Sequence, residues 1–268
     1  MGTALGLDLG RLEQNLRLTG IDPASITDVI LSHAHLDHVG GVTRLDGTLV
    51  YPDAQYHMAA HEWSSGPHPD LRVLPVNDGL RQTFVTTAQR SLGAVHDRVN
   101  FVQAGREIMP GIQAVEAAGH MPGHTALLIT AGKSKLLHVV DVFHHAAFDL
   151  AHPTWQTAFD HDPPGAYATR RRLLDQVCVD RTAVLAYHAP FPGLGHVLVN
   201  GPRYDWVAAP WQFEVQPHPP ALGPADAVRS ALWRPGQWTE SPLSAGRPAS
   251  TRPWPHRSAA LRYPELRC

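Results

Sequence analysis

Four side chains that commonly bind metals lie within six residues, in the run His33-Ala34-His35-Leu36-Asp37-His38. The run comes directly after Asp28-Val29-Ile30-Leu31-Ser32, whose apolar character predicts a short buried strand. Since side chains alternate along an extended chain, His33, His35 and Asp37 are expected on one side. Imidazole and carboxylate groups suit zinc and similar divalent ions, and this set exceeds what one structural site needs. The run therefore predicts a pair of metal ions; the alternative is a solvated histidine-rich loop that binds none.

Three later segments bring further metal-binding side chains, each after an apolar stretch. They are Gly119-His120-Met121-Pro122-Gly123-His124, Asp141 after Val139-Val140, and His188 after Thr182-Ala183-Val184-Leu185. Strands that end at the same rim of a sheet deliver the residues that follow them to one place. The pattern therefore predicts that these segments converge with the first run on a single site.

Together these motifs resemble those of the metallo-β-lactamase superfamily of hydrolases, which carry HxHxDH, a Gly-His-x-x-Gly-His segment, an Asp after a strand and a late His. The resemblance implies a four-layer αβ/βα sandwich of the α/β class. It also implies two divalent metal ions, with zinc expected. One ion would be held by His33, His35 and His120, the second by Asp37, His38 and His188, with Asp141 bridging the two. Within the same segment His124 is expected to support the ligands or to be structural.

A narrower resemblance is to the methyl parathion hydrolase-like branch of that superfamily. It is carried by Tyr51-Pro52-Asp53-Ala54, Phe159-Asp160-His161-Asp162-Pro163, the stretch 188–196 and Asp205-Trp206-Val207-Ala208-Ala209-Pro210-Trp211. His144 fits this branch as well, whereas acyl-homoserine lactonases of similar fold typically place a tyrosine there. The catalytic residues implied are Asp37, Asp141 and His144. Candidates for the pocket wall are His145, His196, Phe143, Phe148, Trp155 and Phe191.

The chemistry expected of such a site is hydrolysis. Two cations about 3.5–4 Å apart share a water, lower its pKa toward 7 and hold it as a bridging hydroxide that attacks carbon or phosphorus. The substrate is expected to be a small ester, phosphotriester or lactone. Two alternatives stay open: an N-acyl-homoserine lactone lactonase, and an inactive, truncated metal-binding relative. A serine hydrolase is disfavoured because the sequence has no Gly-x-Ser-x-Gly motif.

The chain is expected to form one hydrolase domain over residues 1–212 and a tail over 213–268. Leu5, Leu9, Leu12 and Leu16 predict a first helix that Gly20 ends, and the family's earlier strands are expected to be missing. We further expect strands within 48–60, a helix near His61, a hairpin over 126–140 and a helix from Pro163. The tail is rich in proline and arginine and is expected to be disordered. The alternative is a partner-binding arm using Trp233, Trp238 and Trp254.

Composition narrows the range of partners. Hydrophobic residues make up 43% and charged residues 17% of the chain, enough for one sizeable core. A net charge of −2 gives no basic field, so nucleic acid is not expected as a partner. We see no membrane span and no signal peptide, and expect a cytoplasmic protein, with a homodimer left open. Cys178 and Cys268 match no zinc or disulfide spacing, and Cys178 is expected to be buried packing.

Overall fold

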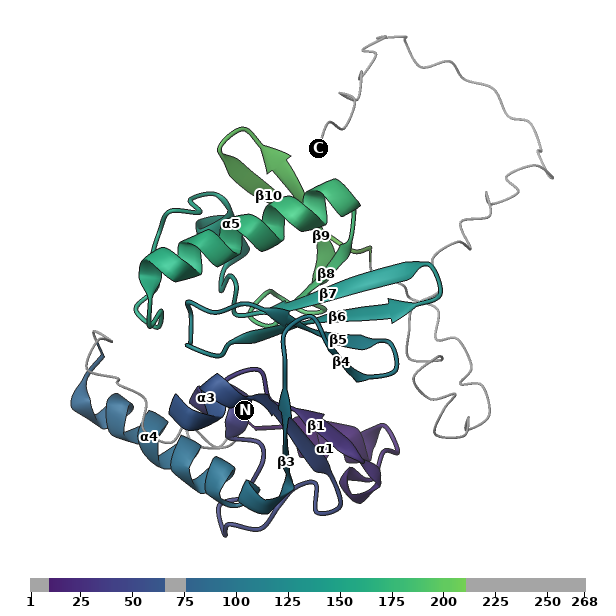
Figure 1. The fold of residues 1–268 in the computed structure, drawn as a ribbon, viewed down its shortest axis with the longest axis vertical. Coiled ribbons are helices and arrows are strands. Elements are labelled where there is room, and N and C mark those ends of the chain that lie inside the picture. The colour runs from purple at the N-terminus through teal and green to yellow at the C-terminus, as the bar shows by residue number, and fades with distance from the viewer. Residues whose placement is uncertain (1–9, 66–75, 211–268) are drawn as a thin grey trace, which may run out of the picture. The chain divides into compact units, whose positions relative to one another are not determined.

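The computed structural model describes residues 10–65 and 76–210. The predicted tail and the first two leucines of the predicted N-terminal helix lie outside this range. The described chain forms a three-stranded and a seven-stranded sheet (Figure 1), each with helices packed against it. Each sheet has its own hydrophobic core.

The three-stranded sheet is parallel, in the order β1 (Asp28–Ile30), β2 (Gln55–Ala59) and β3 (Val99–Val102). Its helices are α1 (Leu12–Leu18), α3 (Ala60–Ser65) and the longer α4 (Asp78–Gly93). Alternation along β2 turns Tyr56 and Met58 to one face, where both are fully buried against Ala88 and Leu92 of α4. This packing fixes α4 on one side of the sheet and leaves its other side toward the rest of the domain.

The seven-stranded sheet has the order β10-β9-β8-β7-β6-β5-β4, and only β7 and β8 run parallel. Its strands are β4 (Glu107–Met109), β5 (Ile112–Glu116), β6 (Thr125–Ala131), β7 (Ser134–Val140), β8 (Ala183–Ala186), β9 (Leu194–Asn200) and β10 (Arg203–Ala208). The parallel pair requires a crossover, which α5 (Pro163–Asp180) supplies. The apolar stripe of α5, which includes Leu173, Val177 and Cys178, packs on the strand residues Leu137 and Val184.

The two helix-covered sheets confirm the predicted αβ/βα class. The hairpin over β6 and β7, the helix from Pro163, the helix near His61 and the buried Cys178 are also confirmed. The prediction of a strand in the first half of residues 48–60 is wrong, because that stretch forms only an isolated bridge between Thr43 and Leu49. The bridge closes a tight turn in which Gly47 adopts a φ of +85°, and residues 50–53 bend and turn again before β2, so no strand forms there.

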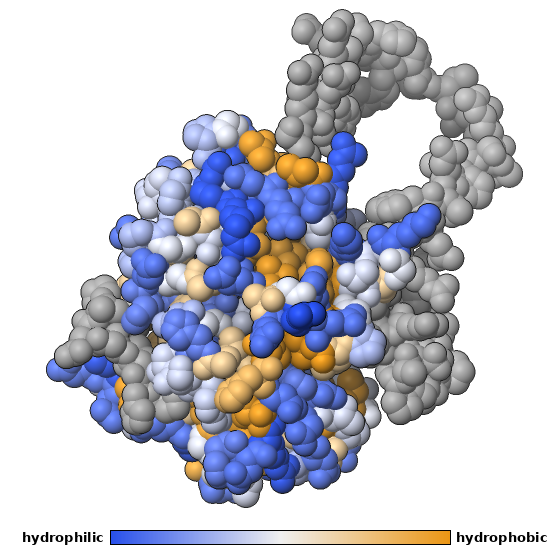
Figure 2. Space-filling model, in the orientation of Figure 1, coloured by the Kyte–Doolittle hydropathy of each residue, from blue (hydrophilic) through white to orange (hydrophobic). Residues whose placement is uncertain are grey.

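Part of the domain's apolar surface is open to solvent. Figure 2 shows apolar side chains gathered in the middle of the viewed face between strongly polar regions. Along β6, the residues from Leu127 to Ala131 are only half-buried, unlike the buried positions on β2. Within the described ranges, no helix combines the length and apolar character needed to cross a bilayer.

Candidate metal centre

The first histidine motif changes conformation halfway along its length. The chain stays extended up to His35, whose φ of −64° and ψ of 148° make it the residue before helix α2 (Leu36–Val39). Asp37 and His38 lie within that single helical turn. The expectation that Asp37 continues an extended alternation is therefore wrong. The turn instead separates Asp37 and His38 from His33 and His35, which join a different group of side chains.

The later candidates follow strands of the seven-stranded sheet. His120 comes after β5, Asp141 directly after β7, and His188 after β8. Val140, the last residue of β7, has a φ of 53°, which is unusual for a β-branched residue and costs on the order of 1–3 kcal/mol. The strand register shifts at the same point. This bend ends the pairing with β8 immediately before Asp141, at the centre of the site.

All seven predicted ligands come together in space. Two groups have donor atoms within 4.8 Å of one another, and they match the two sets implied by the resemblance: His33, His35, His120 and Asp141 in one, and Asp37, His38 and His188 in the other. A third combination joins Asp141, His144 and His188. The structure shows that these side chains converge, and their role as metal ligands stays a prediction.

One oxygen of Asp141 lies at the centre of the cluster. The Nε2 atoms of five histidines lie 3.2 to 3.7 Å from its Oδ2: His38, His120, His188, His144 and His33. The carboxylate is almost fully buried. Asp141 thus lies within reach of histidines from both ligand groups, as a residue that bridges two metal ions would have to.

Burial and charge set the protonation of the cluster. Burial lowers the pKa of His33 and of His35 well below the usual range, which favours neutral rings with free nitrogen lone pairs. Burial alone would raise the pKa of Asp141, but hydrogen bonds from the surrounding histidines hold it well below its usual range. Burial alone would also lower the pKa of His120, but hydrogen bonds to Asp141 and Asp160 raise it to about 9. Neutral imidazoles and an ionised carboxylate are the forms that coordinate metals, so binding an ion would displace a proton from His120.

The residues present fit a metal. Nε2 of His33, Nε2 of His35 and Oδ1 of Asp141 are buried and have no hydrogen-bond partner among the described residues. Buried polar atoms of this kind cost roughly 1–3 kcal/mol each unless something binds them. Divalent cations in the two groups would satisfy these atoms with the nitrogen and oxygen donors that zinc prefers.

Sequence reasoning missed several residues that hold the candidate ligands in place. Asp160 lies 3.0 Å from Nδ1 of His120, and the fully buried Glu62 accepts hydrogen bonds from two backbone N–H groups of the motif loops. The hydroxyl of Tyr187 donates to the backbone oxygen of Asp37 at 3.0 Å. His124, expected to be a supporting residue, accepts from the backbone N–H of Asp141 at 3.3 Å. Asp160 was expected only as part of the stretch that carries the narrower family resemblance, and nothing in the sequence indicated a role for Glu62.

Of the predicted catalytic residue His144 and the predicted pocket-wall residues, some lie at the cluster and others do not. His144 lies at the cluster, its ring stacked on that of His188 with centroids 5.2 Å apart. His145 is instead exposed and caps the short helix over Ala146–Leu150, and His196 is exposed on β9. Phe143 is fully buried in the core and cannot line a pocket. The other three predicted aromatic walls are exposed: Phe148, Trp155 and Phe191.

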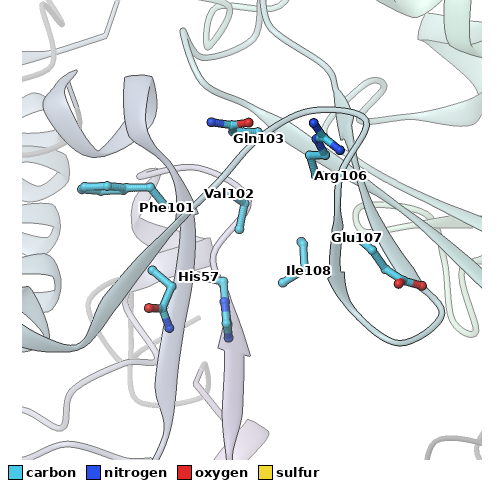
Figure 3. A pocket seen from close by; sticks show the side chains of 8 residues that line it. His57, Phe101, Val102, Gln103, Arg106, Glu107 and Ile108 are labelled. Atoms are coloured by element: carbon cyan, nitrogen blue, oxygen red, sulfur yellow. The ribbon is translucent and has the colours of Figure 1, made fainter.

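A pocket of about 380 Å³ lies between β3 and the loop and strand around β4 (Figure 3). Its lining includes Asn100, Gln103, Arg106 and His57, whose Nε2 lies 2.7 Å from Oδ1 of Asp28. None of the seven predicted ligands lines this pocket. It is therefore not the space beside the histidine cluster.

The two covered sheets and the buried histidine and aspartate cluster between their loops define a class of αβ/βα proteins built around a metal centre. The chain belongs to the metallo-beta-lactamase superfamily, whose family model matches residues 2–188. The resemblance to that superfamily is thereby confirmed, and its methyl parathion hydrolase-like branch stays a prediction.

The chain is similar to several proteins named as lactonases. N-acyl homoserine lactonase AttM of Agrobacterium fabrum is 30% identical over 151 residues, which cover 55% of this chain and 51% of that protein. An N-acyl homoserine lactonase of a Bacillus species is 26% identical over 125 residues, covering 46% of this chain and 41% of that protein. The chain thus spans about half the length of the curated relatives it matches.

Solved structures agree with the fold. AidC, a dizinc quorum-quenching lactonase in complex with its product N-hexanoyl-L-homoserine, superposes with a TM-score of 0.74 at 28% identity. The match covers 79% of this chain and 74% of AidC. The hydrolase AbOPH superposes with a TM-score of 0.71 at 24% identity, covering 78% of this chain and 73% of AbOPH, and shows the shared fold alone.

Proposed function

We propose that this chain is a metal-dependent hydrolase that opens N-acyl homoserine lactones or closely similar esters. The observation that carries the proposal is the convergence of seven metal-binding side chains from four separated segments, with buried nitrogen and oxygen atoms left unpaired. The lactonase relatives and the fold of AidC support the choice of a lactone.

The chain's own residues would hold two divalent cations, one in each group around Asp141. Such ions polarise a carbonyl oxygen and make bound water acidic. Neutral His33 and His35 leave the centre positively charged when it is loaded, which favours an anionic transition state. Burial of both residues keeps bulk water away from these donors.

His144 is the group we assign to proton transfer. Its Nε2 lies 3.5 Å from Oδ2 of Asp141, and its side chain is more exposed than that of Asp141. A ring in this position reaches both the cluster and the open side, where the departing oxygen of a substrate needs a proton. Tyr187, packed on the ring of His38 with centroids 4.3 Å apart, would line the same side.

Metal analysis and a substrate panel test this function. We expect the purified protein to carry about two equivalents of zinc or a similar ion, and to open an acyl-homoserine lactone faster than it cleaves an aryl ester or a phosphotriester. A chelator and His35→Ala should each abolish turnover. His96→Ala, which changes an exposed histidine outside the cluster, is the matched control and should not. Protein that is folded and free of metal under all loading conditions would refute the proposal.

Aryl-ester or phosphotriester hydrolysis is the second candidate. It is favoured by the histidine at position 144, which fits the methyl parathion hydrolase-like pattern, whereas similar lactonases carry tyrosine there. The same panel separates the two, since His144→Tyr should shift the ratio of lactone to phosphotriester turnover toward the lactone. An unchanged ratio would remove the reason for this second candidate.

A further inference from the structure

Glu62 is a carboxylate with no exposure to solvent, on the short helix α3 that follows β2. Buried carboxylates are costly unless they are hydrogen-bonded, so its partners indicate what it does. Burial raises the pKa of Glu62, while hydrogen bonds from two backbone N–H groups act in the opposite direction. The charges of His120 and His61 also act to lower its pKa. Its contacts with the backbone are therefore the feature to explain.

The two oxygens of Glu62 reach two different loops. Oε1 accepts from the N–H of Ala34 at 2.8 Å, and Oε2 accepts from the N–H of Gly123 at 2.8 Å. Ala34 lies between His33 and His35, and Gly123 lies between His120 and His124. One carboxylate thus holds the loop that follows β1 of the three-stranded sheet and the loop that follows β5 of the seven-stranded sheet.

The approach of the second loop is close enough to depend on glycine. A Cβ added at Gly123 would meet the backbone nitrogen of Glu62 at 2.3 Å, so no other residue fits without a shift. A further backbone bond, from the N–H of Thr125 to the oxygen of Ser32 at 3.1 Å, joins the same two segments. The two segments are therefore held together at two points, which lie on either side of His33 along the chain.

We propose that Glu62 is a positioning residue that fixes the spacing of the two histidine loops and so sets the metal affinity of the group containing His33, His35, His120 and Asp141. This inference rests on the proposed function for its metal, but not for its contacts. Charge-assisted bonds from a carboxylate to backbone N–H groups are about twice as strong as neutral ones. Partners behind metal ligands commonly change affinity by about 10–100-fold when they are altered.

Glu62→Gln tests the contact without a metal. The side chain keeps its size, but its single oxygen can accept from only one N–H, and its NH₂ group faces the other donor. In chelator-treated protein we expect amide hydrogen exchange at Ala34, at Gly123 or at both to become at least about tenfold faster. Protection equal to that of the wild type at both amides would overturn the proposed clamp, whether or not the protein binds zinc.

Zinc titration against a competing chelator tests the consequence. We expect Glu62→Gln to bind the ion of this group about 10–100-fold more weakly than the wild type. Tyr56→Phe is the matched control, because it removes one buried hydrogen bond, from Tyr56 to the backbone oxygen of Tyr51, without touching either loop. It should lower the melting temperature and leave zinc affinity unchanged. The proposal would be overturned if Glu62→Gln bound zinc as tightly as the wild type, or if Tyr56→Phe lost as much zinc affinity as Glu62→Gln. Either result would mean that Glu62 contributes only to the general stability of the domain.

Glu62→Asp provides the same comparison if Glu62→Gln does not fold, since it keeps the charge and loses one methylene of reach. It should likewise weaken zinc binding and speed exchange at one of the two amides. A wild-type protein that binds neither zinc nor a similar divalent ion would refute the proposed hydrolase, while the exchange measurement would still decide whether Glu62 holds the loops.

Discussion

Asp160 lies 3.0 Å from Nδ1 of His120, on the side of the ring opposite Nε2, which faces Asp141 at 3.3 Å. Burial alone would raise the pKa of Asp160, but the hydrogen bond and charge of His120 hold it below its usual range. Burial alone would lower the pKa of His120, but hydrogen bonds to Asp141 and Asp160 raise it to about 9. An ionised Asp160 keeps the Nδ1 proton, so Nε2 is the nitrogen that faces the cluster and would give up its own proton to bind an ion. This relationship selects the tautomer that a metal ligand needs.

Asp160→Asn should therefore weaken metal binding. The amide is a poorer acceptor, and it must also replace the contact from the N–H of Thr157 to Oδ2 of Asp160. We expect about tenfold or greater loss of zinc affinity, read by chelator competition. Asp175→Asn, which alters a carboxylate on α5 that pairs with Tyr204, is the control and should not change affinity. Unaltered binding in Asp160→Asn would show that the contact does not tune His120.

His144→Ala separates proton transfer from metal binding. If His144 serves the departing group, kcat should fall by about 10²–10⁴-fold while metal content stays the same. His145→Ala changes the neighbouring exposed ring that caps the Ala146–Leu150 helix, and it should leave kcat near the wild-type value. Loss of an equivalent of metal in His144→Ala would instead assign this histidine to the group with Asp141 and His188.

Gly123→Ala should destabilise the domain. Its new Cβ would meet the backbone of Glu62 at 2.3 Å, and overpacking of this kind costs about 1–3 kcal/mol or more. Gly93→Ala, at the end of α4, places its Cβ where no atom lies within 4 Å. The latter should be neutral or stabilising by up to about 1 kcal/mol. Urea denaturation of the two variants gives the comparison, and equal free energies of unfolding would contradict it.

The metal-free protein should lose stability in acid through His124. Burial, together with the charge of His120, lowers the pKa of His124 to about 3, whereas an unfolded histidine takes up a proton near pH 6.5. Between these values the unfolded state binds more protons, so stability from this residue is present above pH 6.5 and falls by up to about 1.4 kcal/mol per pH unit toward pH 3.

His124→Gln removes this titration. Glutamine can still donate to the oxygen of Ala117 and accept from the N–H of Asp141, the two contacts that His124 makes. Free energies of unfolding measured at several pH values with a chelator present should therefore show a shallower slope in the variant. A slope identical to that of the wild type would mean that His124 is protonated in the folded state.

The sequence was sufficient for the candidate ligands because each belongs to a local motif after a strand. His33, His35 and His38 stand within one run, and Asp141 follows an apolar stretch that the structure confirms as β7. The same local reasoning failed at Asp37, where it extended the strand pattern into what is a helical turn. Residue spacing alone does not show where an extended segment ends.

Glu62 could not have been predicted in this way. A glutamate near the start of a helix ordinarily faces solvent, and its burial here depends on partners 28 and 61 residues away along the chain. Asp160 likewise acts across a separation of 40 residues. Such contacts follow from how the two sheets meet, which periodicity and composition do not encode. The wall prediction for Phe143 failed for the same reason, since it packs in a core formed by α5 and strands of the seven-stranded sheet.

Both predicted ligand sets are divided between the two sheets. His33, His35, Asp37 and His38 follow β1 of the three-stranded sheet, while His120, Asp141 and His188 follow strands of the seven-stranded sheet. Neither sheet supplies a complete set, so a small separation of the two sheets would break up both ligand sets at once. Any ion held there would in turn cross-link the two sheets, and the lifetime of the bound ion would report how often the sheets separate.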